Sequence, residues 1–317
     1  HTAHKDYKSA EKQVKNAINI YKKFYESLAI PYLITRRPEW DKFPGAAYTI
    51  AFDTVMPDGR SLQIGTVHHL ADNFSKTFGI TYEDVGGERK FVHQTCYGIS
   101  ERCIAALISV HGDNLGLVLP FDFAPVQIVI IPILYKGEEE KVLSFARKIY
   151  EKLKQKYRVV LDDSEERPGA KYYKWELKGA ALRIEIGPKE AREGKVLISF
   201  RDEREKIEIN LEDLNFNKID QWASEMRERL YEKAIEKFKQ CIKYFENVNE
   251  ISSWLKKGIA LIHLCNSEKC GRALEENTSG SLLGWLEEVP SWINCKVEGK
   301  CIICKNNSKI AVLARTY

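Results

Sequence analysis

The sequence predicts a multidomain protein in which α+β parts flank a smaller α/β part, and three observations lead to this fold class. The chain has 317 residues, which corresponds to about two domains of roughly 150 residues each. Two strand-like runs joined by a tight turn near the N-terminus predict an antiparallel hairpin. Strands and helices then alternate between residues 124 and 212, which is typical of a small α/β domain.

The first third of the chain is expected to form a long helix, a hairpin and a strand followed by a helix. Apolar residues recur every three or four positions over residues 5–28, which predicts an amphipathic helix. The runs 46–56 and 61–69 have strand composition and flank the turn Pro57-Asp58-Gly59. The elements expected next are a short helix at 70–78, a strand near 90–97 and a helix over 100–111 with Ser100 as its N-cap.

The middle of the chain is expected to begin a new domain. Pro120 and Pro125 bracket a short linker, and the run VQIVIIPI that follows predicts a fully buried strand. The elements expected after it are a helix over 138–157, a strand over 157–161, a helix over 169–177 and strands over 181–187 and 195–200. A long helix from Asn217 to about residue 246 then leads into the last 70 residues, which hold five of the eight cysteines.

The composition excludes several classes of protein. Apolar residues make up 44% and charged residues 30% of the chain, which excludes intrinsic disorder, collagen and disulfide-rich mini-proteins. The longest apolar run, at 126–135, is about half a membrane span, and no apolar segment follows the N-terminus, so neither a membrane span nor a signal peptide is expected. The net charge of +4 does not by itself identify a nucleic-acid-binding protein. We expect a cytoplasmic protein with no membrane association.

Four cysteines form two close pairs near the C-terminus. Cys265 and Cys270 are separated by four residues, and Cys301 and Cys304 by two. Two such pairs can complete a closed tetrahedral zinc site, in which four thiolates leave no position open for catalysis. A redox pair beside unrelated buried thiols is the alternative, and structural zinc is favoured over it. Cys295 is a spare thiol that would be able to replace one ligand.

A glycine and an arginine at a strand–helix junction suggest an anion site. Gly98 ends the strand and allows close approach to the backbone, while Arg102 lies in the first turn of the next helix. Backbone N–H groups and the helix dipole already favour anions at that position, and a guanidinium there suits phosphate. An ordinary arginine paired with a surface carboxylate is an equally good explanation of this segment.

The strand at 61–69 carries three polar candidates for ligand binding. Side chains alternate along a strand, so Gln63 is expected on the face of Gly65 and Val67, whereas Thr66 and His68 share the other face. Thr66 and His68 are therefore expected to contact one ligand together. Polar pairing between strands on a solvated face is the competing interpretation. The residues alone thus indicate an anion-binding α/β protein with a metal site.

Seven segments, taken in order, resemble the prolyl-tRNA synthetases of archaeal and eukaryotic type, a family of class II aminoacyl-tRNA synthetases. They are HTAH at the start, EWDKFPGAAYTI, MPDGRSLQIGTVHHLADNFSKTF, TCYGISERCIAALISVHGDNLGLVLP, APVQIVIIPI, RPGAKYYKWELKGAALRIEIGPKE and the Cys-rich tail that ends in ARTY. Seven matches in the family's order over the whole chain make the resemblance specific.

The resemblance implies an architecture of three parts. Residues 1–122 resemble the later part of the antiparallel class II catalytic sheet and end in motif 3. Residues 124–212 resemble a mixed α/β anticodon-binding domain, and residues 217–317 an α+β zinc-binding domain. In the family, motif 1 and most of motif 2 precede HTAH, so the resemblance implies that this chain carries only part of the catalytic domain.

The resemblance also implies a reaction and its participants. Proline attacks the α-phosphate of ATP, and the prolyl-adenylate then acylates the terminal ribose of tRNA(Pro). The implied cofactors are ATP, Mg²⁺ and a structural Zn²⁺. The implied partners are proline, tRNA(Pro) and a second copy of the chain in a homodimer. Little acid–base chemistry is required, because orientation and stabilisation of phosphate charge carry the catalysis.

Individual residues match the family's site positions. Arg102 matches the catalytic motif 3 arginine that holds the ATP triphosphate, and Gly98 matches a glycine near the adenosine and proline. The LQ-x-G-T-x-H run that lines the adenylate and proline pocket supplies Gln63 and Thr66 for the adenylate and His68 for proline. His1 matches the first histidine of the HTAH sequence, close to the proline ring.

Three further matches lie in the second domain, and one lies at the C-terminus. Glu176 and Arg183 match positions that read anticodon bases, and Lys206 is a weaker candidate on the same surface. A proline anticodon ends in two guanines, which arginine reads well. Tyr317 matches a C-terminal tyrosine that folds back toward the catalytic domain.

Two other functions compete with a proline–tRNA ligase. One is a non-catalytic synthetase-like protein that binds tRNA or senses amino acids, although such a protein would not need a phosphate-binding Arg102. The other is a structural zinc and RNA-binding module that uses the basic residues at 147–158. A mixed charge run on a helix is usually a solvated face, which disfavours this second alternative.

Overall fold

The computed structural model describes residues 1–203, 205–293, 295 and 298–317, and their contacts divide the chain into two units. Unit 1 contains His1–Glu26, Ile30–Ala106 and Ile235–Tyr317. Unit 2 contains Ser27–Ala29 and Leu107–Ala234. No helix among the described residues is long and apolar enough to cross a membrane.

A nine-stranded sheet forms the centre of unit 1. Its strand order is β1-β7-β4-β3-β2-β15-β16-β14-β13, and every neighbouring pair is antiparallel except β13 with β14. The strands are β1 (Thr2–His4), β2 (Leu33–Arg36), β3 (Tyr48–Val55), β4 (Ser61–Ala71), β7 (His93–Ile99), β13 (Ile242–Phe245), β14 (Ile259–Leu264), β15 (Ser281–Leu286) and β16 (Lys309–Ala314).

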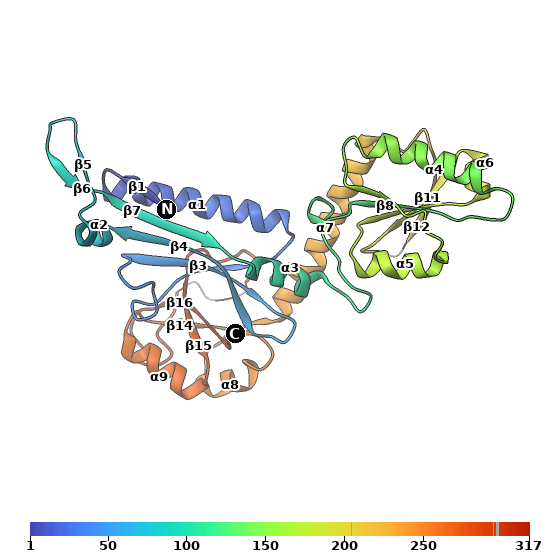
Figure 1. The fold of residues 1–317 in the computed structure, drawn as a ribbon. Coiled ribbons are helices and arrows are strands. Elements are labelled where there is room, and N and C mark those ends of the chain that lie inside the picture. The colour runs from blue at the N-terminus through green and yellow to red at the C-terminus, as the bar shows by residue number, and fades with distance from the viewer. Residues whose placement is uncertain (204, 294, 296–297) are drawn as a thin grey trace. The chain divides into compact units, whose positions relative to one another are not determined.

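Helix α1 (Tyr7–Ser27) runs along the face of β3, β4 and β7 (Figure 1). Its buried residues recur at the spacing of one helical face: Ala10, Val14, Ala17, Tyr21 and Tyr25. The predicted helix over 5–28 is therefore confirmed, and so is the hairpin of β3 and β4. Gly59 in the hairpin turn has φ of +81°, and a Cβ there would lie 2.5 Å from the carbonyl carbon of Lys257.

The C-terminal residues share the same sheet as the N-terminal ones. Strand β15 pairs with β2, with Trp285 opposite Arg36 and Leu286 opposite Thr35. Helices α8 (Ile251–Trp254) and α9 (Glu268–Thr278) lie on one side of these strands (Figure 1). Residues 235–317 therefore belong to the same unit as residues 1–26 and 30–106, because sheet hydrogen bonds join them. The three-part division expected from sequence stays a prediction.

Unit 2 is built on a five-stranded mixed sheet in the order β12-β11-β10-β8-β9. The strands are β8 (Ile128–Pro132), β9 (Val159–Leu161), β10 (Leu182–Ile186), β11 (Lys195–Phe200) and β12 (Lys206–Asn210). Strands β8, β9 and β10 are parallel, and β11 and β12 continue antiparallel. Helices α4 (Glu139–Leu153) and α6 (Pro188–Glu193) cover one face and α5 (Pro168–Leu177) covers the other (Figure 1). The predicted alternation is confirmed, whereas α6 and β12 were not predicted.

The long helix predicted to reach residue 246 ends earlier. Helix α7 (Phe216–Gln240) is followed by β13, which pairs in parallel with β14. Ile242 and Phe245 fit helical spacing, but the run Ile-Lys-Tyr-Phe also has strand composition. The Ile259 N–H donates to the Cys241 carbonyl at 2.8 Å where β13 begins to pair with β14, and this pairing overrides the helical pattern.

Three short elements of unit 1 and one helix that begins in unit 1 and ends in unit 2 complete this part of the chain. They are α2 (Asn73–Phe78), β5 (Thr81–Glu83), β6 (Arg89–Phe91) and α3 (Arg102–His111). The single strand predicted near 90–97 is therefore two strands. Ser100 caps α3 as predicted, because the Arg102 N–H lies 3.3 Å from the Ser100 hydroxyl oxygen.

Candidate functional site

A cavity of about 320 Å³ in unit 1 brings together five of the predicted site residues. It lies over β4, β7 and the start of α3. The predicted residues that line it are Gln63, Thr66, His68, Gly98 and Arg102. In the pairing of β4 with β7, Thr66 lies opposite Gly98 and His68 lies opposite Cys96. These two residue pairs form part of the cavity floor.

A bulge in β4 corrects one prediction. Gln63 was expected on the face opposite Thr66 and His68, and this expectation is wrong. Phe52 pairs with Gly65 and Asp53 pairs with Gln63, so Ile64 is an extra residue in β4. One extra residue reverses the alternation of side chains. Gln63, Thr66 and His68 consequently line the same cavity.

The bulge is held by side chains on its far side. The Tyr25 hydroxyl donates to the Ile64 carbonyl at 2.7 Å, and the Cys103 thiol donates to the same oxygen at 3.0 Å. A Cβ on Gly65 would lie only 2.5 Å from the Tyr25 hydroxyl oxygen, so the position needs glycine. Sequence analysis identified neither Tyr25 nor Cys103 as a residue that positions this strand. The only sequence signal for this role was that Tyr25 lies on the apolar face of the predicted helix.

His68 is a half-buried imidazole at the cavity floor. Its Nδ1 lies 2.9 Å from the Thr49 hydroxyl oxygen, which also accepts the Phe43 N–H at 3.1 Å. This hydrogen bond between the Thr49 hydroxyl and Nδ1 orients the imidazole ring, whichever of the two atoms donates. Burial lowers the pKa of His68, so the ring is uncharged near neutral pH.

Gly98 and Arg102 leave room for a ligand at the strand–helix junction. A Cβ built on Gly98 meets no described atom within 4 Å. Arg102 is the first residue of α3 and is exposed, so its guanidinium is accessible beside the helix N-terminus. Tyr97, on the other face of β7, accepts a hydrogen bond from Gln13 of α1 at 2.9 Å.

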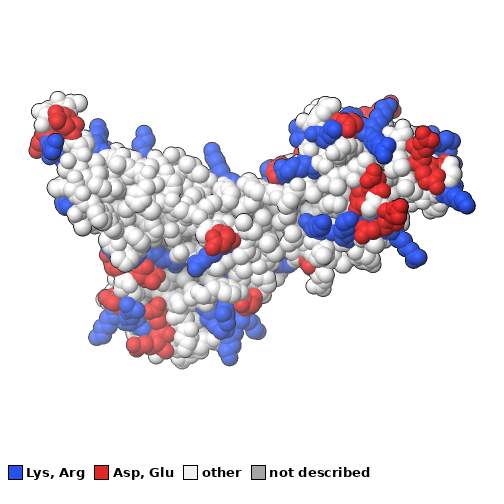
Figure 2. Space-filling model, in the orientation of Figure 1, with Lys and Arg blue, Asp and Glu red and all other residues white. Residues whose placement is uncertain are grey.

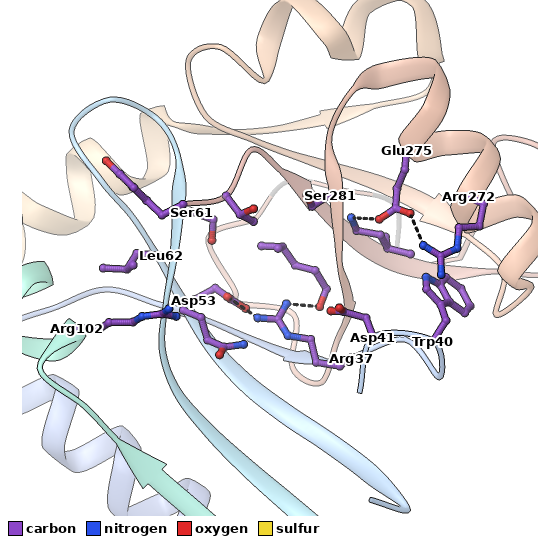
Figure 3. Close-up of a pocket in the computed structure, with 15 residues that line it drawn as sticks. Arg37, Trp40, Asp41, Asp53, Ser61, Leu62, Arg102, Arg272, Glu275 and Ser281 are labelled. Atoms are coloured by element: carbon purple, nitrogen blue, oxygen red, sulfur yellow. Dashed lines mark hydrogen bonds and ion pairs between the residues drawn. The ribbon is translucent and has the colours of Figure 1, made fainter. Parts of the chain in front are cut away.

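A second cavity, of about 300 Å³, is shown in Figure 3. Gln63 and Arg102 line both this cavity and the first. The floor of the second cavity is the buried ion pair of Arg37 with Asp53, whose atoms lie 2.7 Å apart. Arg37 also donates to the Leu283 carbonyl of β15 at 2.5 Å. The Ser61 hydroxyl lines this cavity and is buried with no hydrogen-bond partner among the described residues.

The last residues of the chain border this second cavity. The Ser61 N–H donates to the Arg315 carbonyl at 2.8 Å, and Ser61 forms a parallel bridge with Thr316. Tyr317 lines the cavity, and the Arg60 guanidinium lies 5.4 Å from the centre of its ring. The C-terminus therefore lies beside β4, near Gln63.

His1 is not brought into either cavity. It precedes β1, is exposed and is absent from both sets of lining residues. Strand β1 pairs with β7 through Thr2 opposite Thr95 and His4 opposite His93, which directs the HTAH segment to the edge of the sheet.

The four predicted cysteines lie together in unit 1. The Sγ atoms of Cys265, Cys270, Cys301 and Cys304 all lie within 4.8 Å of one another, and those of Cys265 and Cys304 are 3.6 Å apart. Cys265 follows β14, Cys270 is on α9, and the other two lie in the turn before β16. Cys295 does not join them and packs instead against the core formed by residues such as Phe238 and Ile259.

The local backbone favours one thiolate in this cluster. Burial acts to raise the pKa of Cys301, but the N–H groups of Cys304, Cys265 and Ile303 outweigh it and lower the pKa to about 7. Burial raises the pKa of Cys270 to about 12. The donor set of four sulfurs suits Zn²⁺, because Zn–S bonds of about 2.3 Å place tetrahedral sulfurs roughly 3.8 Å apart.

The three predicted anticodon residues line one small cavity of about 100 Å³ in unit 2. The Arg183 Nη1 of β10 lies 2.9 Å from the Glu176 carboxylate of α5, and Lys206 approaches from β12. Sequence reasoning missed Arg201, which also lines this cavity. Arg201 is buried and donates to both carboxylate oxygens of Asp113 at 2.6 and 2.9 Å. The sequence signal for Arg201 was its position directly after the apolar run of β11.

Comparison with protein families gives two matches, one mostly within the N-terminal part of unit 1 and one within unit 2. Residues 1–111 match the tRNA synthetase class II core domain (G, H, P, S and T). Residues 127–219 match the anticodon binding domain. The first range holds the larger cavity with Arg102, and the second holds the cavity with Arg183.

Individual relatives share most of this chain. The proline–tRNA ligase of Archaeoglobus fulgidus is 60% identical over 317 residues, which are 100% of this chain and 66% of that protein. The proline–tRNA ligase of Methanococcus vannielii is 44% identical over 322 residues, covering 100% of this chain and 67% of that protein. The chain thus spans about two thirds of the length of these relatives.

Solved structures agree with these relatives. The prolyl-tRNA synthetase of Cryptosporidium parvum in complex with L-proline and AMP superposes with a TM-score of 0.91 at 32% identity, over 99% of this chain and 66% of that one. The same enzyme with halofuginone and AMPPNP gives a TM-score of 0.91 at 33% identity, over 99% and 67%. With sequence identity of this level along its full length and the same fold, the chain belongs to the prolyl-tRNA synthetase family of class II aminoacyl-tRNA synthetases.

Proposed function

We propose that this chain belongs to a proline–tRNA ligase, which activates proline with ATP and transfers it to tRNA(Pro). The observation that carries this proposal is the single cavity lined by Gln63, Thr66, His68, Gly98 and Arg102. A related enzyme has been crystallised with L-proline and AMP, which are the two halves of the expected intermediate.

The proposed reaction has two steps and needs little acid–base chemistry from the protein. The carboxylate of proline attacks the α-phosphorus of ATP, and pyrophosphate leaves. A ribose hydroxyl of tRNA then attacks the carbonyl carbon of the adenylate, and AMP leaves. Arg102 would stabilise the charge of the triphosphate, and Mg²⁺ would be bound mainly through the phosphates. His68, which is neutral, would contact proline without adding a charge to the pocket.

We propose that the cavity in unit 2 reads bases of the anticodon. Arg183 supplies N–H donors for the O6 and N7 atoms of guanine, and Glu176 supplies an acceptor for its N–H groups. The 2.9 Å ion pair between these side chains orients both toward the same small cavity. Lys206 adds a cation from the neighbouring strand.

A structural zinc ion is the proposed occupant of the four-cysteine cluster. Four thiolates complete its coordination and link β14, α9 and the turn before β16. We expect metal analysis of the purified protein to find one zinc per chain, and Cys301→Ser to lower that content. Cys295→Ser is the matched control, because Cys295 lies outside the cluster. Absence of zinc together with four freely titrating thiols would contradict the proposal.

The structure disfavours a general RNA-binding role for the basic residues at 147–158. Lys154 pairs with Glu151 at 2.7 Å, and Lys156 pairs with Asp220 within the same unit. Figure 2 shows acidic and basic side chains interspersed over the visible surface of unit 2. Charge of mixed sign gives only a weak attraction to phosphate.

Proline-dependent exchange of pyrophosphate into ATP tests the proposed reaction. It is measured on this chain and on a version extended to the full length of the relatives. Proline-dependent exchange by this chain or by the extended version supports the ligase. The extended version is expected to form a homodimer. Absence of exchange in both forms, with anticodon-dependent tRNA binding retained, would favour a non-catalytic relative that binds tRNA.

A further inference from the structure

A buried carboxylate joins the cationic side chains of the unit 2 cavity. Glu185 of β10 is only 4% exposed and is bonded by side chains from three elements. Its Oε1 accepts from Arg183 Nε at 3.0 Å. Its Oε2 accepts from the Tyr172 hydroxyl of α5 at 2.9 Å and from Lys206 Nζ of β12 at 2.9 Å. Both carboxylate oxygens are therefore committed within the protein.

These bonds fix the plane of the Arg183 guanidinium. Nε is bonded to Glu185, Nη1 to Glu176 at 2.9 Å and Nη2 to Ser199 at 3.3 Å. The Arg183 guanidinium also lies over the Tyr172 ring, 4.2 Å from its centre. A guanidinium has five N–H donors, so two remain for a ligand in this cavity.

The same carboxylate also restrains Lys206. The side chain of Lys206 is 41% exposed, so without Glu185 its ammonium group would be free to turn toward solvent. Glu176 and Glu185 balance the charges of Arg183 and Lys206, which leaves this cluster of four side chains without net charge. A neutral cluster attracts the phosphate backbone only weakly, so the binding of RNA to this cluster depends on contacts with base edges.

We infer that Glu185 is a positioning residue for anticodon recognition: it directs Arg183 and Lys206 toward base edges and holds Lys206 away from the phosphate backbone. The inference rests on the proposed reading of the anticodon by this cavity. Glu185 itself contacts no base, because Arg183, Tyr172 and Lys206 occupy its oxygens. The ligand class is an unpaired guanine-containing segment of RNA.

Glu185→Gln tests this inference, because it keeps the shape of the side chain and removes its charge. Dissociation constants are measured for tRNA(Pro) and for a variant tRNA in which the two anticodon guanines are replaced. We expect the ratio of the two constants to fall about tenfold, within the range for loss of one well-oriented base contact. We also expect the variant tRNA to bind as tightly as before or more tightly, since the cluster gains positive charge.

The salt dependence of binding gives a second readout. A released Lys206 would contact a phosphate, so the slope of log K against log salt should steepen by about one in Glu185→Gln. The double variant Glu185→Gln/Lys206→Met should lose this increase. Glu185→Asp, which restores the charge on a shorter side chain, should recover part of the discrimination. Glu208→Gln is the matched control, because Glu208 of β12 makes exposed pairs with Lys189 and Lys195.

Three results would overturn the inference. The first is an unchanged ratio in Glu185→Gln, and the second is equal weakening of both tRNAs, which a merely structural role predicts. The third is a steeper salt slope that persists in the double variant. If thermal unfolding shows that Glu185→Gln does not fold, the comparison of Glu185→Asp and Lys206→Met decides instead, with reduced discrimination expected in both. Failure of the unaltered protein to distinguish the two tRNAs would refute the proposed anticodon reading itself.

Discussion

Arg102 is the residue on which the proposed activation step depends most. We expect Arg102→Ala to lower proline-dependent pyrophosphate exchange by about 100- to 1000-fold, the usual effect of removing one donor to developing charge. Its side chain is exposed, so the thermal unfolding temperature should not change. Arg89→Ala on β6, which is exposed and outside both cavities, is the control and should retain exchange. Full exchange in Arg102→Ala would remove Arg102 from the mechanism.

His68 should titrate at an unusually low pH. Burial lowers its pKa from 6.5, and the unfolded chain therefore takes up this proton at a higher pH than the folded protein. The contribution of His68 to stability is thus present above pH 6.5 and is lost as the pH falls through the folded pKa.

Nuclear magnetic resonance of the histidine ring protons measures this directly. The midpoint for His68 should lie below 6.5, and Phe43→Ala should move it toward that value by admitting water to the ring. A midpoint of 6.5 or higher in the unaltered protein would contradict the assigned environment.

The residues proposed to contact a ligand were easier to predict than the residues that orient them. Arg102 and Gly98 follow from a strand–helix junction, and Thr66 and His68 follow from alternation along a strand. Tyr25 acts through the backbone carbonyl of Ile64, and Glu185 acts through other side chains. Tyr25 and Ile64 are 39 residues apart. Glu185 is 13 residues from Tyr172 and 21 from Lys206, so no local pattern contains these contacts.

Among the elements, the bulge of β4 has the clearest effect on the site. Gly65→Ala would place a methyl group 2.5 Å from the Tyr25 hydroxyl oxygen, and overpacking of this kind costs about 1–3 kcal/mol of folding free energy. Displacement of the bulge should also raise KM for ATP, because Gln63 would leave the cavity face. Denaturant unfolding and exchange kinetics measure the two effects.

A second substitution separates the clash from other causes. Tyr25→Phe in the Gly65→Ala background removes the opposing oxygen and should recover part of the lost stability. Gly169→Ala in α5 meets no described atom within 4 Å and should be neutral or slightly stabilising. Equal stability of Gly65→Ala and the unaltered protein would show that the bulge tolerates a side chain.

The sequence predicted most helices and strands up to residue 240 but none of those after it, and it misjudged elements that depend on distant partners. Periodicity located α1, the β3–β4 hairpin and the alternation of unit 2. It extended α7 by six residues, because Ile242 and Phe245 fit a helix until β14 is present to pair with them. It also missed β2, a four-residue strand whose partners are β3 and, from the far end of the chain, β15.

At the scale of the whole molecule, the buried pair of Arg37 and Asp53 ties the two ends of the chain together. Arg37 bonds Asp53 of β3 and the Leu283 carbonyl of β15, across the line where N-terminal and C-terminal strands meet. Asp53→Asn would leave Arg37 buried without a counter-charge, which should cost about 3–5 kcal/mol. Thermal unfolding followed by circular dichroism measures this loss.

The neighbouring pair of Arg36 and Glu287 provides a matched comparison. It lies at the same junction of β2 and β15 but is more exposed, so Glu287→Gln should cost about 1 kcal/mol or less. Similar losses in Asp53→Asn and Glu287→Gln would show that burial does not distinguish the two pairs.

The meeting of β2 with β15 also determines when the protein is able to fold. These strands are about 250 residues apart, as the pair Trp285 and Arg36 shows, so the sheet of unit 1 stays open until the end of the chain is available. Nearly all of unit 2 comes from the continuous stretch Leu107–Ala234. During synthesis, unit 2 is therefore expected to fold first, while the unfinished sheet of unit 1 exposes the edge of β2 until β15 and β16 emerge from the ribosome.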